Sequence, residues 1–144
     1  MRTVEIVVYG EPVPQGRPRF TTIHGYPRAY DPQKSRNFKQ WVRLCAIQAV
    51  KKIDGFKPFE KACIVDVCFY RHIPSSWSNK KRMDAHNGVI RPTTRPDLGN
   101  YEKGFYDALT GIVWVDDSVV TDKHVKKRYT AELTRVEIKV MEVE

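Results

Sequence analysis

The chain has 144 residues, 41% of them hydrophobic, and a formal net charge of +8 at pH 7. This length predicts a single domain over residues 1–144, because it is enough for one hydrophobic core without stabilising disulfides or metals. No apolar run approaches the roughly 20 residues that span a bilayer, so we expect no membrane segment, no export and a cytoplasmic location. The basic charge favours a polyanionic partner, and a basic protein with no special partner is the alternative.

The three cysteines give no disulfide framework, because their number is odd. Cys63 and Cys68 lie five residues apart in a predicted strand and therefore point to opposite faces, which argues against a disulfide or a zinc pair. No histidine stands at a metal-ligand spacing from Cys45, Cys63 or Cys68.

The chain opens with a predicted buried strand over residues 3–9, which Gly10, Pro12 and Pro14 end. An irregular loop is expected to follow. It carries three arginines that match phosphate oxygens in pairs and are candidate DNA contacts: Arg17, Arg19 and Arg28. A solvated loop whose charges only maintain solubility is the alternative.

The longest predicted helix begins with Asp31 as N-cap and Pro32 at the first helical position, and ends at Asp54-Gly55. Its apolar residues recur with the helical period and should face the sheet, and the stripe is wide enough to feed a dimer contact as well. They are Phe38, Trp41, Val42, Cys45, Ala49 and Ile53, widened by Leu44 and Ile47.

Residues 62–70 are predicted to form a second strand, in which Asp66 is either an exposed edge charge or a neighbour of the acidic cluster described below. Residues 71–95 show little periodicity and read as a flexible basic loop. Trp77 and the run Lys80-Lys81-Arg82 suit a DNA-gripping flap whose aromatic ring stacks on an exposed base. A mobile loop without such a role is the other interpretation.

The stretch from residue 95 to residue 122 contains most of the candidate catalytic and metal-binding residues. Asp97 is the predicted N-cap of a helix that Gly111 ends, and Asn100, Lys103 and Asp107 share its polar face. The apolar run 112–115 is expected to form a strand that delivers Asp116 and Asp117. If this strand pairs beside the helix start, Asp117 can approach Asp97, and such carboxylates could hold Mg²⁺.

Two further strands are predicted over residues 118–129 and 132–143. Strands therefore outnumber helices, and no repeat or linker divides the chain. The expected fold is α/β (α+β), with a mixed sheet of four or five strands and two main helices packed on it.

Three short motifs stand out together: Asp97-Leu98-Gly99-Asn100 with Lys103, Asp107-Ala108-Leu109-Thr110-Gly111, and Val115-Asp116-Asp117. They resemble the signature of the RusA-type endodeoxyribonucleases, which resolve four-way Holliday junctions. The opening residues 10–20 and the segment Ala29-Tyr30-Asp31-Pro32 resemble members found in phages and prophages. The resemblance implies a homodimer that acts on DNA junctions with Mg²⁺ or Mn²⁺.

Carried over residue by residue, the resemblance makes Asp97 and Asp117 metal ligands, with Asp116 sharing their work. It makes Lys103 the catalytic lysine and Asn100 the residue that orients a ligand or the phosphate. A non-catalytic protein that binds junctions or duplexes is the alternative, and an RNA-binding module is disfavoured because no RNP or KH signature occurs.

The chain departs from the family pattern at Gly99, where the motif has aspartate. Glycine provides no side-chain oxygen, so metal affinity should fall while folding and DNA binding persist. Two explanations stay open. One is an inactivating substitution, and the other is a natural member that has lost the ligand or replaced it through Glu102, Asp107 or Asp116.

Overall fold

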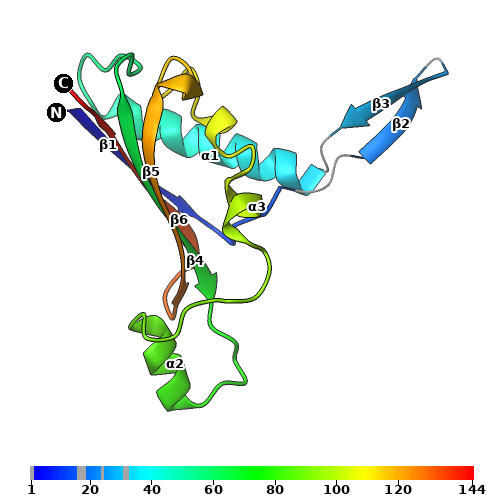
Figure 1. Ribbon diagram of the computed structural model, residues 1–144, viewed down its shortest axis with the longest axis vertical. Helices are drawn as coiled ribbons and strands as arrows, with labels where there is room; N and C mark the ends of the chain where they lie inside the picture. The colour runs from blue at the N-terminus through cyan, green and yellow to red at the C-terminus, as the bar shows by residue number, and fades with distance from the viewer. Residues whose placement is uncertain (1, 16–18, 24, 31–32) are drawn as a thin grey trace.

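The computed structural model describes residues 2–15, 19–23, 25–30 and 33–144. Its body is a four-stranded sheet in the order β1-β6-β4-β5, in which β4 and β5 are parallel and the other neighbours antiparallel. The helix α1 (Gln33–Lys51) crosses one face of this sheet (Figure 1). The strands are β1 (Arg2–Tyr9), β4 (Cys63–His72), β5 (Val120–Thr130) and β6 (Arg135–Glu142). The predicted α+β fold with a mixed sheet is confirmed.

The core lies between this sheet and α1, and it follows from the alternation along each strand. In β1, Val4, Ile6 and Val8 are buried while the residues between them are exposed. Val42 and Ala46, one helical turn apart on α1, are fully buried on the facing side. Burying a valine or isoleucine side chain stabilises the fold by about 1.5–3 kcal/mol.

The apolar stripe of α1 is only partly in this core. Trp41, Leu44 and Ile53 were predicted to face the sheet or to widen that stripe, but they are 46%, 50% and 39% exposed. The helix contacts the sheet along the line of Val42 and Ala46, so neighbouring positions fall at its rim. The helix also ends at Lys51, earlier than predicted, and its predicted first residues, Asp31 and Pro32, lie outside the described part.

The segment predicted to be an irregular loop contains a hairpin, which corrects that prediction. Strands β2 (Arg19–Ile23) and β3 (Tyr26–Tyr30) pair antiparallel and extend beyond the N-terminal end of α1 (Figure 1). In the register, Thr21 pairs with Arg28 and Thr22 with Pro27. With only five residues each, the two strands are too short for their period to stand out in the sequence.

Residues 71–95 were also predicted to lack regular structure, and this is wrong for their centre. Helix α2 (Asn79–His86) forms there, beyond the end of β4 (Figure 1), and the Ser78 side chain caps it by accepting a hydrogen bond from the Lys81 N–H. Only Ala85 of α2 is buried, in a small second core with Ile73 and Tyr129. A helix with one buried residue has no apolar period to detect.

The helix predicted to run from Asp97 to Gly111 is broken in two. Helix α3 (Leu98–Glu102) is followed by a turn and the 3-10 helix η1 (Tyr106–Ala108). Gly104 separates them because its φ of +78° lies in the left-handed region. A β-carbon at this position would also lie 2.7 Å from the Gln15 side chain.

Residues 112–115 were predicted to form a strand and instead form a tight turn, in which residues 112–114 are buried and Val115 is exposed. Trp114 makes isolated bridges with Phe59 and Thr110, and its indole N–H donates to the Thr110 hydroxyl at 3.0 Å. Val113 and Trp114 are fully buried, so their apolar character serves the core rather than a sheet ladder. Within the described residues, none of the helices has the length and hydrophobicity needed to cross a bilayer.

Candidate active site

The short helix α3 presents three of the predicted site residues at the surface. The Asp97 Oδ1 atom accepts a hydrogen bond from the Asn100 N–H at 3.0 Å, which confirms Asp97 as the N-cap. Lys103 ends the helix as its C-cap, and its N–H donates to the Gly99 carbonyl at 2.9 Å. Asp97, Asn100 and Lys103 are all exposed, so a DNA backbone can reach them.

Asp116 and Asp117 lie just before β5. Asp116 is the N-cap of the 3-10 helix η2 (Asp117–Val119), and its Oδ2 atom accepts from the Ser118 N–H at 3.3 Å. Hydrogen bonds from the side chain and backbone of Ser118 hold the pKa of Asp116 below its ordinary value. Asp116 and Asp117 are both exposed. This carboxylate pair is therefore available to a cation or to solvent.

The segments that carry Asp97 and Asp117 meet strand β5 at different positions along its length. The Pro96 carbonyl, next to Asp97, accepts from Lys127 at 3.1 Å, whereas Asp117 precedes the first residue of β5, Val120. Seven positions of β5 separate Val120 from Lys127, about 23 Å of strand at roughly 3.3 Å per residue. The condition for their approach, a strand 112–115 beside the helix start, is not met.

The fit to a divalent cation is accordingly partial. Asp97, Asp116 and Asp117 supply the hard carboxylate oxygens that Mg²⁺ prefers. However, among the described residues no three His, Cys, Asp or Glu side chains lie close enough together to hold a metal ion. The assignment of these residues to catalysis and metal binding therefore remains a prediction.

Glu102, one of the residues considered as a replacement ligand, already has partners. Its Oε1 atom lies 3.2 Å from the Lys123 ammonium and accepts from the Tyr106 hydroxyl at 2.8 Å. The Lys123 ammonium also lies 4.3 Å from the centre of the Tyr106 ring. Burial and the hydrogen bond to Glu102 raise the pKa of Tyr106, so this phenol stays protonated. A lysine this close competes with a metal for Glu102, which leaves Asp107 and Asp116 as the accessible alternatives.

Two cations that the sequence analysis did not assign to the site hold the segment before Asp97. Arg71 donates to the carbonyl and hydroxyl oxygens of Thr94 at 3.1 and 3.3 Å. The Lys127 ammonium donates to the carbonyl oxygens of Thr94 and Pro96 at 3.0 and 3.1 Å. No local pattern could have identified them, because these contacts depend on how β4 and β5 meet the 94–97 segment.

Position 99 can accept a larger side chain. Gly99 is exposed, its φ lies outside the left-handed region, and a β-carbon built on it meets no atom within 4 Å. The glycine is therefore not required by the backbone or by close packing at this point. The β-carbon of the aspartate that the family motif has here would meet no obstruction.

The predicted DNA contacts lie in two separate elements. Arg17 is outside the described residues, and Arg19 and Arg28 lie in strands β2 and β3. Lys80, Lys81 and Arg82 all lie in α2. Figure 1 shows the hairpin and α2 at opposite ends of the molecule, with α3 between them. A ligand that contacts both the hairpin and α2 would therefore have to extend past α3 along the length of the molecule.

Trp77 and Arg82 have structural partners around α2, and the stacking of Trp77 on an exposed base stays a prediction. The Trp77 ring packs edge to face against Tyr129 in the second core, with centres 5.2 Å apart, and the Lys81 ammonium lies 4.0 Å from its centre. Arg82 donates to the Pro74 carbonyl at 2.9 Å and so helps to hold the loop before the helix. Lys80 is exposed, and it makes neither the ring contact of Lys81 nor the carbonyl contact of Arg82.

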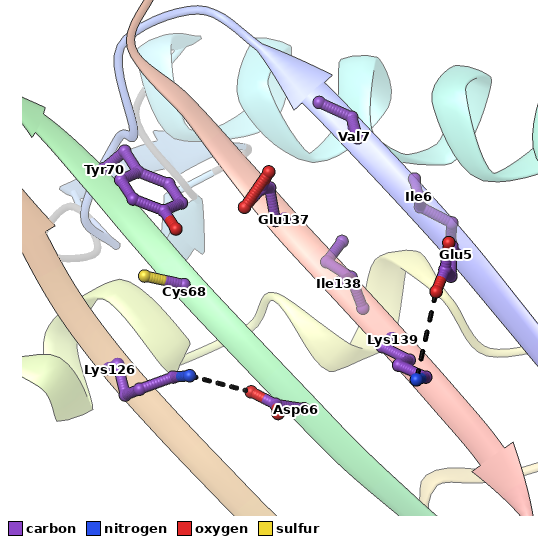
Figure 2. Close-up of a pocket in the computed structure, with 10 residues that line it drawn as sticks. All are labelled: Glu5, Ile6, Val7, Asp66, Cys68, Tyr70, Lys126, Glu137, Ile138 and Lys139. Atoms are coloured by element: carbon purple, nitrogen blue, oxygen red, sulfur yellow. Dashed lines mark ion pairs between the residues drawn. The ribbon is translucent and has the colours of Figure 1, made fainter. Parts of the chain in front are cut away.

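The sheet face opposite α1 is a second polar surface, shown in Figure 2. Asp66 pairs with Lys126 at 3.5 Å and Glu5 with Lys139 at 3.9 Å, around a hollow of about 300 Å³. Asp66 therefore lies on an inner strand and on the face away from α3, and it is neither an edge charge nor part of the acidic site. The alternating charges balance one another across the strands.

Comparisons with known proteins agree with the motif. The family model described as "Endodeoxyribonuclease RusA" matches residues 9–141. The chain is also 44% identical over 145 residues to "Uncharacterized protein YqaN" of Bacillus subtilis (strain 168), covering 99% of each chain. The family match includes α3, η2, β4, β5 and almost all of β6, but only the last residue of β1, Tyr9.

Proposed function

Because this chain belongs to the RusA endodeoxyribonuclease family, we propose that it is a Holliday junction resolvase that cuts four-way DNA junctions with paired, symmetric nicks. Membership gives the class, a junction-resolving type of DNA endonuclease, and the finer activity is our proposal. The observation that carries it is the family match over residues 9–141, which includes the exposed Asp97, Asn100 and Lys103 of α3. Recombination and repair are the processes that such an activity would serve.

In this proposal Asp97 and Asp117, with Asp116, are the carboxylates for Mg²⁺ or Mn²⁺, and binding of the ion or of DNA would have to bring their two segments together. A bound divalent ion polarises a phosphate and lowers the pKa of a bound water. The exposed Lys103 would balance the charge that develops on the phosphate oxygens, since a cation at the developing charge stabilises the transition state. Asn100 would orient the phosphate through its amide.

Gly99 should limit cutting rather than binding. DNA affinity depends on basic side chains that neutralise phosphates, and the chain has 25 Lys and Arg residues against 17 Asp and Glu. Metal affinity depends on the number of carboxylates in the site, and position 99 contributes none. We therefore expect tight junction binding together with slow incision.

A homodimer belongs to the same proposal, because two symmetric nicks require two active sites related by a two-fold axis. The partners are then a second copy of the chain and a four-way junction. A location in the cytoplasm of a bacterial or phage-infected cell remains a prediction.

The test is Gly99→Asp, assayed on a labelled four-way junction and on a linear duplex over a series of Mg²⁺ and Mn²⁺ concentrations. We expect metal-dependent, symmetric nicks in the junction and little cutting of the duplex. The double variant Gly99→Asp with Asp97→Asn is the matched control and should bind without cutting. Tight binding with no incision at any metal concentration would overturn the proposed mechanism.

A non-catalytic junction-binding protein is the second candidate. Two observations favour it: Gly99, and the lack of a three-residue metal cluster among the described side chains. It predicts that Asp97→Asn and Asp117→Asn leave junction affinity unchanged and that Gly99→Asp does not cut. The same gel assay therefore separates the two candidates.

A further inference from the structure

Two lysines of β5 contact opposite ends of α3. Lys123 and Lys127 are four positions apart on an edge strand, so they share a face and lie about 13 Å apart at roughly 3.3 Å per residue. Lys127 contacts the Pro96 carbonyl, just before the helix, and Lys123 contacts Glu102, its last residue. Helix α3 therefore runs antiparallel to β5 between two cationic contacts.

The Lys127 contact is directional. One ammonium group bonds two carbonyl oxygens, those of Thr94 and Pro96, and Arg71 of the neighbouring strand bonds Thr94 as well. Hydrogen bonds from a charged donor are shorter and stronger than neutral ones. They fix the backbone directly before Asp97, and hence the direction in which the helix begins.

The Lys123 contact fixes the other end. Glu102 is tied to β5 through the lysine and to η1 through the Tyr106 hydroxyl. The Glu102 side chain is only 22% exposed, so this ion pair is less screened by water than a fully exposed one. With only five residues, α3 has little helical stability of its own and depends on such tertiary contacts.

We propose that Lys123 and Lys127 are positioning residues, which hold the two ends of α3 on β5 and thereby set where the Asp97 carboxylate and the Asn100 amide lie relative to the bound DNA. The effect on catalysis rests on the proposed function. That the two lysines hold α3 on β5 does not depend on it. Misplacement of a reacting group by about 1 Å can cost about 100-fold in rate. Loss of either contact should therefore lower the turnover without weakening DNA binding.

The structural test is amide hydrogen exchange of the full chain in Lys123→Met and Lys127→Met. The Tyr101 and Lys103 N–H groups donate to carbonyls within α3, and we expect both to exchange about ten times faster when its ends are released. Lys126→Met is the matched control, because Lys126 lies on the same strand but pairs with Asp66 on the opposite face. Unchanged exchange in both test variants would overturn the proposal.

The functional test uses the same substitutions in the Gly99→Asp chain. We expect kcat on the junction to fall about 10-fold or more with KM within twofold, and Lys127→Arg, which keeps a cationic donor, to recover most of the loss. An unchanged kcat in the cutting chain would refute the positioning role. If Gly99→Asp does not cut, the proposed function fails instead, and the exchange rates alone decide whether the lysines hold α3.

Discussion

The Asp97 carboxylate accepts a hydrogen bond from the Asn100 N–H at 3.0 Å, so the residue proposed as a metal ligand is also the N-cap of α3. One oxygen is thereby committed to the helix. The other can point toward a cation, which lets a single side chain serve structure and chemistry. Substitutions at this position must separate the two roles.

We expect Asp97→Asn to keep the stability of the chain and Asp97→Ala to reduce it by about 0.5–2 kcal/mol, because asparagine caps a helix about as well as aspartate. Urea unfolding followed by circular dichroism measures both. In the Gly99→Asp chain, both substitutions should abolish incision. An asparagine variant that unfolds as easily as the alanine variant would show that the charge, rather than the cap, stabilises α3.

Gly99→Ala should stabilise the chain by about 0.5–1 kcal/mol, since alanine in a helix costs less backbone entropy than glycine and nothing obstructs its β-carbon. Thermal and urea unfolding would measure this gain. The alanine variant adds no carboxylate and should not gain incision, so it is the matched control for Gly99→Asp. Gly104→Ala should destabilise the chain instead, because its φ is +78° and the Gln15 side chain is close.

Glu142 should make stability depend on pH below neutrality. Burial would raise the pKa of Glu142, but hydrogen bonds from Arg2 and from the N–H groups of Lys61 and Glu60 outweigh it, and the pKa lies below its ordinary value of 4.5. Its contribution is therefore fully present above pH 4.5 and is lost as pH falls through the lowered pKa.

We accordingly expect Glu142→Gln to lose about 1.5–3 kcal/mol at pH 7, in the range for hydrogen bonds to a charged group, and to lose less at pH 3. Urea unfolding at the two pH values gives the comparison. Glu5→Gln is the control, because Glu5 is an exposed partner of Lys139 at 3.9 Å and should change stability by less than about 0.5 kcal/mol. Equal losses at both pH values would refute the assignment.

Lys80→Ala should weaken junction binding and reduce the slope of log K against log salt concentration by about 0.9, the value for one phosphate contact. Arg82→Ala should instead loosen α2, because Arg82 holds the Pro74 carbonyl. Fluorescence titrations of a labelled junction between about 50 and 200 mM salt measure the slope. A slope unchanged by Lys80→Ala would place α2 away from the DNA.

The exposed apolar residues of α1 give a test of the homodimer. Trp41 and Leu44 line a groove with Val7 and Tyr9 of the edge strand β1, and each of the four is 41–54% exposed. Such a patch is a candidate contact for a second copy. We expect Leu44→Arg to convert a dimer to a monomer in analytical ultracentrifugation; a dimer that persists would exclude this surface as the contact.

Local patterns determined much of this fold in advance. The apolar residues of the segment 3–9 predicted a strand, although it is buried on one face only, and the position of Asp97 before a helical period predicted its cap. Both signals lie within a few residues of chain and need no knowledge of the partner element. The motif around Asp97, Asn100 and Lys103 likewise pointed to the family that the comparison then found.

Only the tertiary structure decided where these pieces lie. The break at Gly104 beside the Gln15 side chain, the packing of Trp77 against Tyr129, and the different positions at which the segments of Asp97 and Asp117 meet β5 all depend on contacts between distant segments. The sequence showed Lys123 and Lys127 only as lysines of a predicted strand. The alignment of β5 with α3 brings them into contact with Glu102 and the Pro96 carbonyl. Sequence periodicity reports which face of an element is buried, and it carries no information about which element lies opposite.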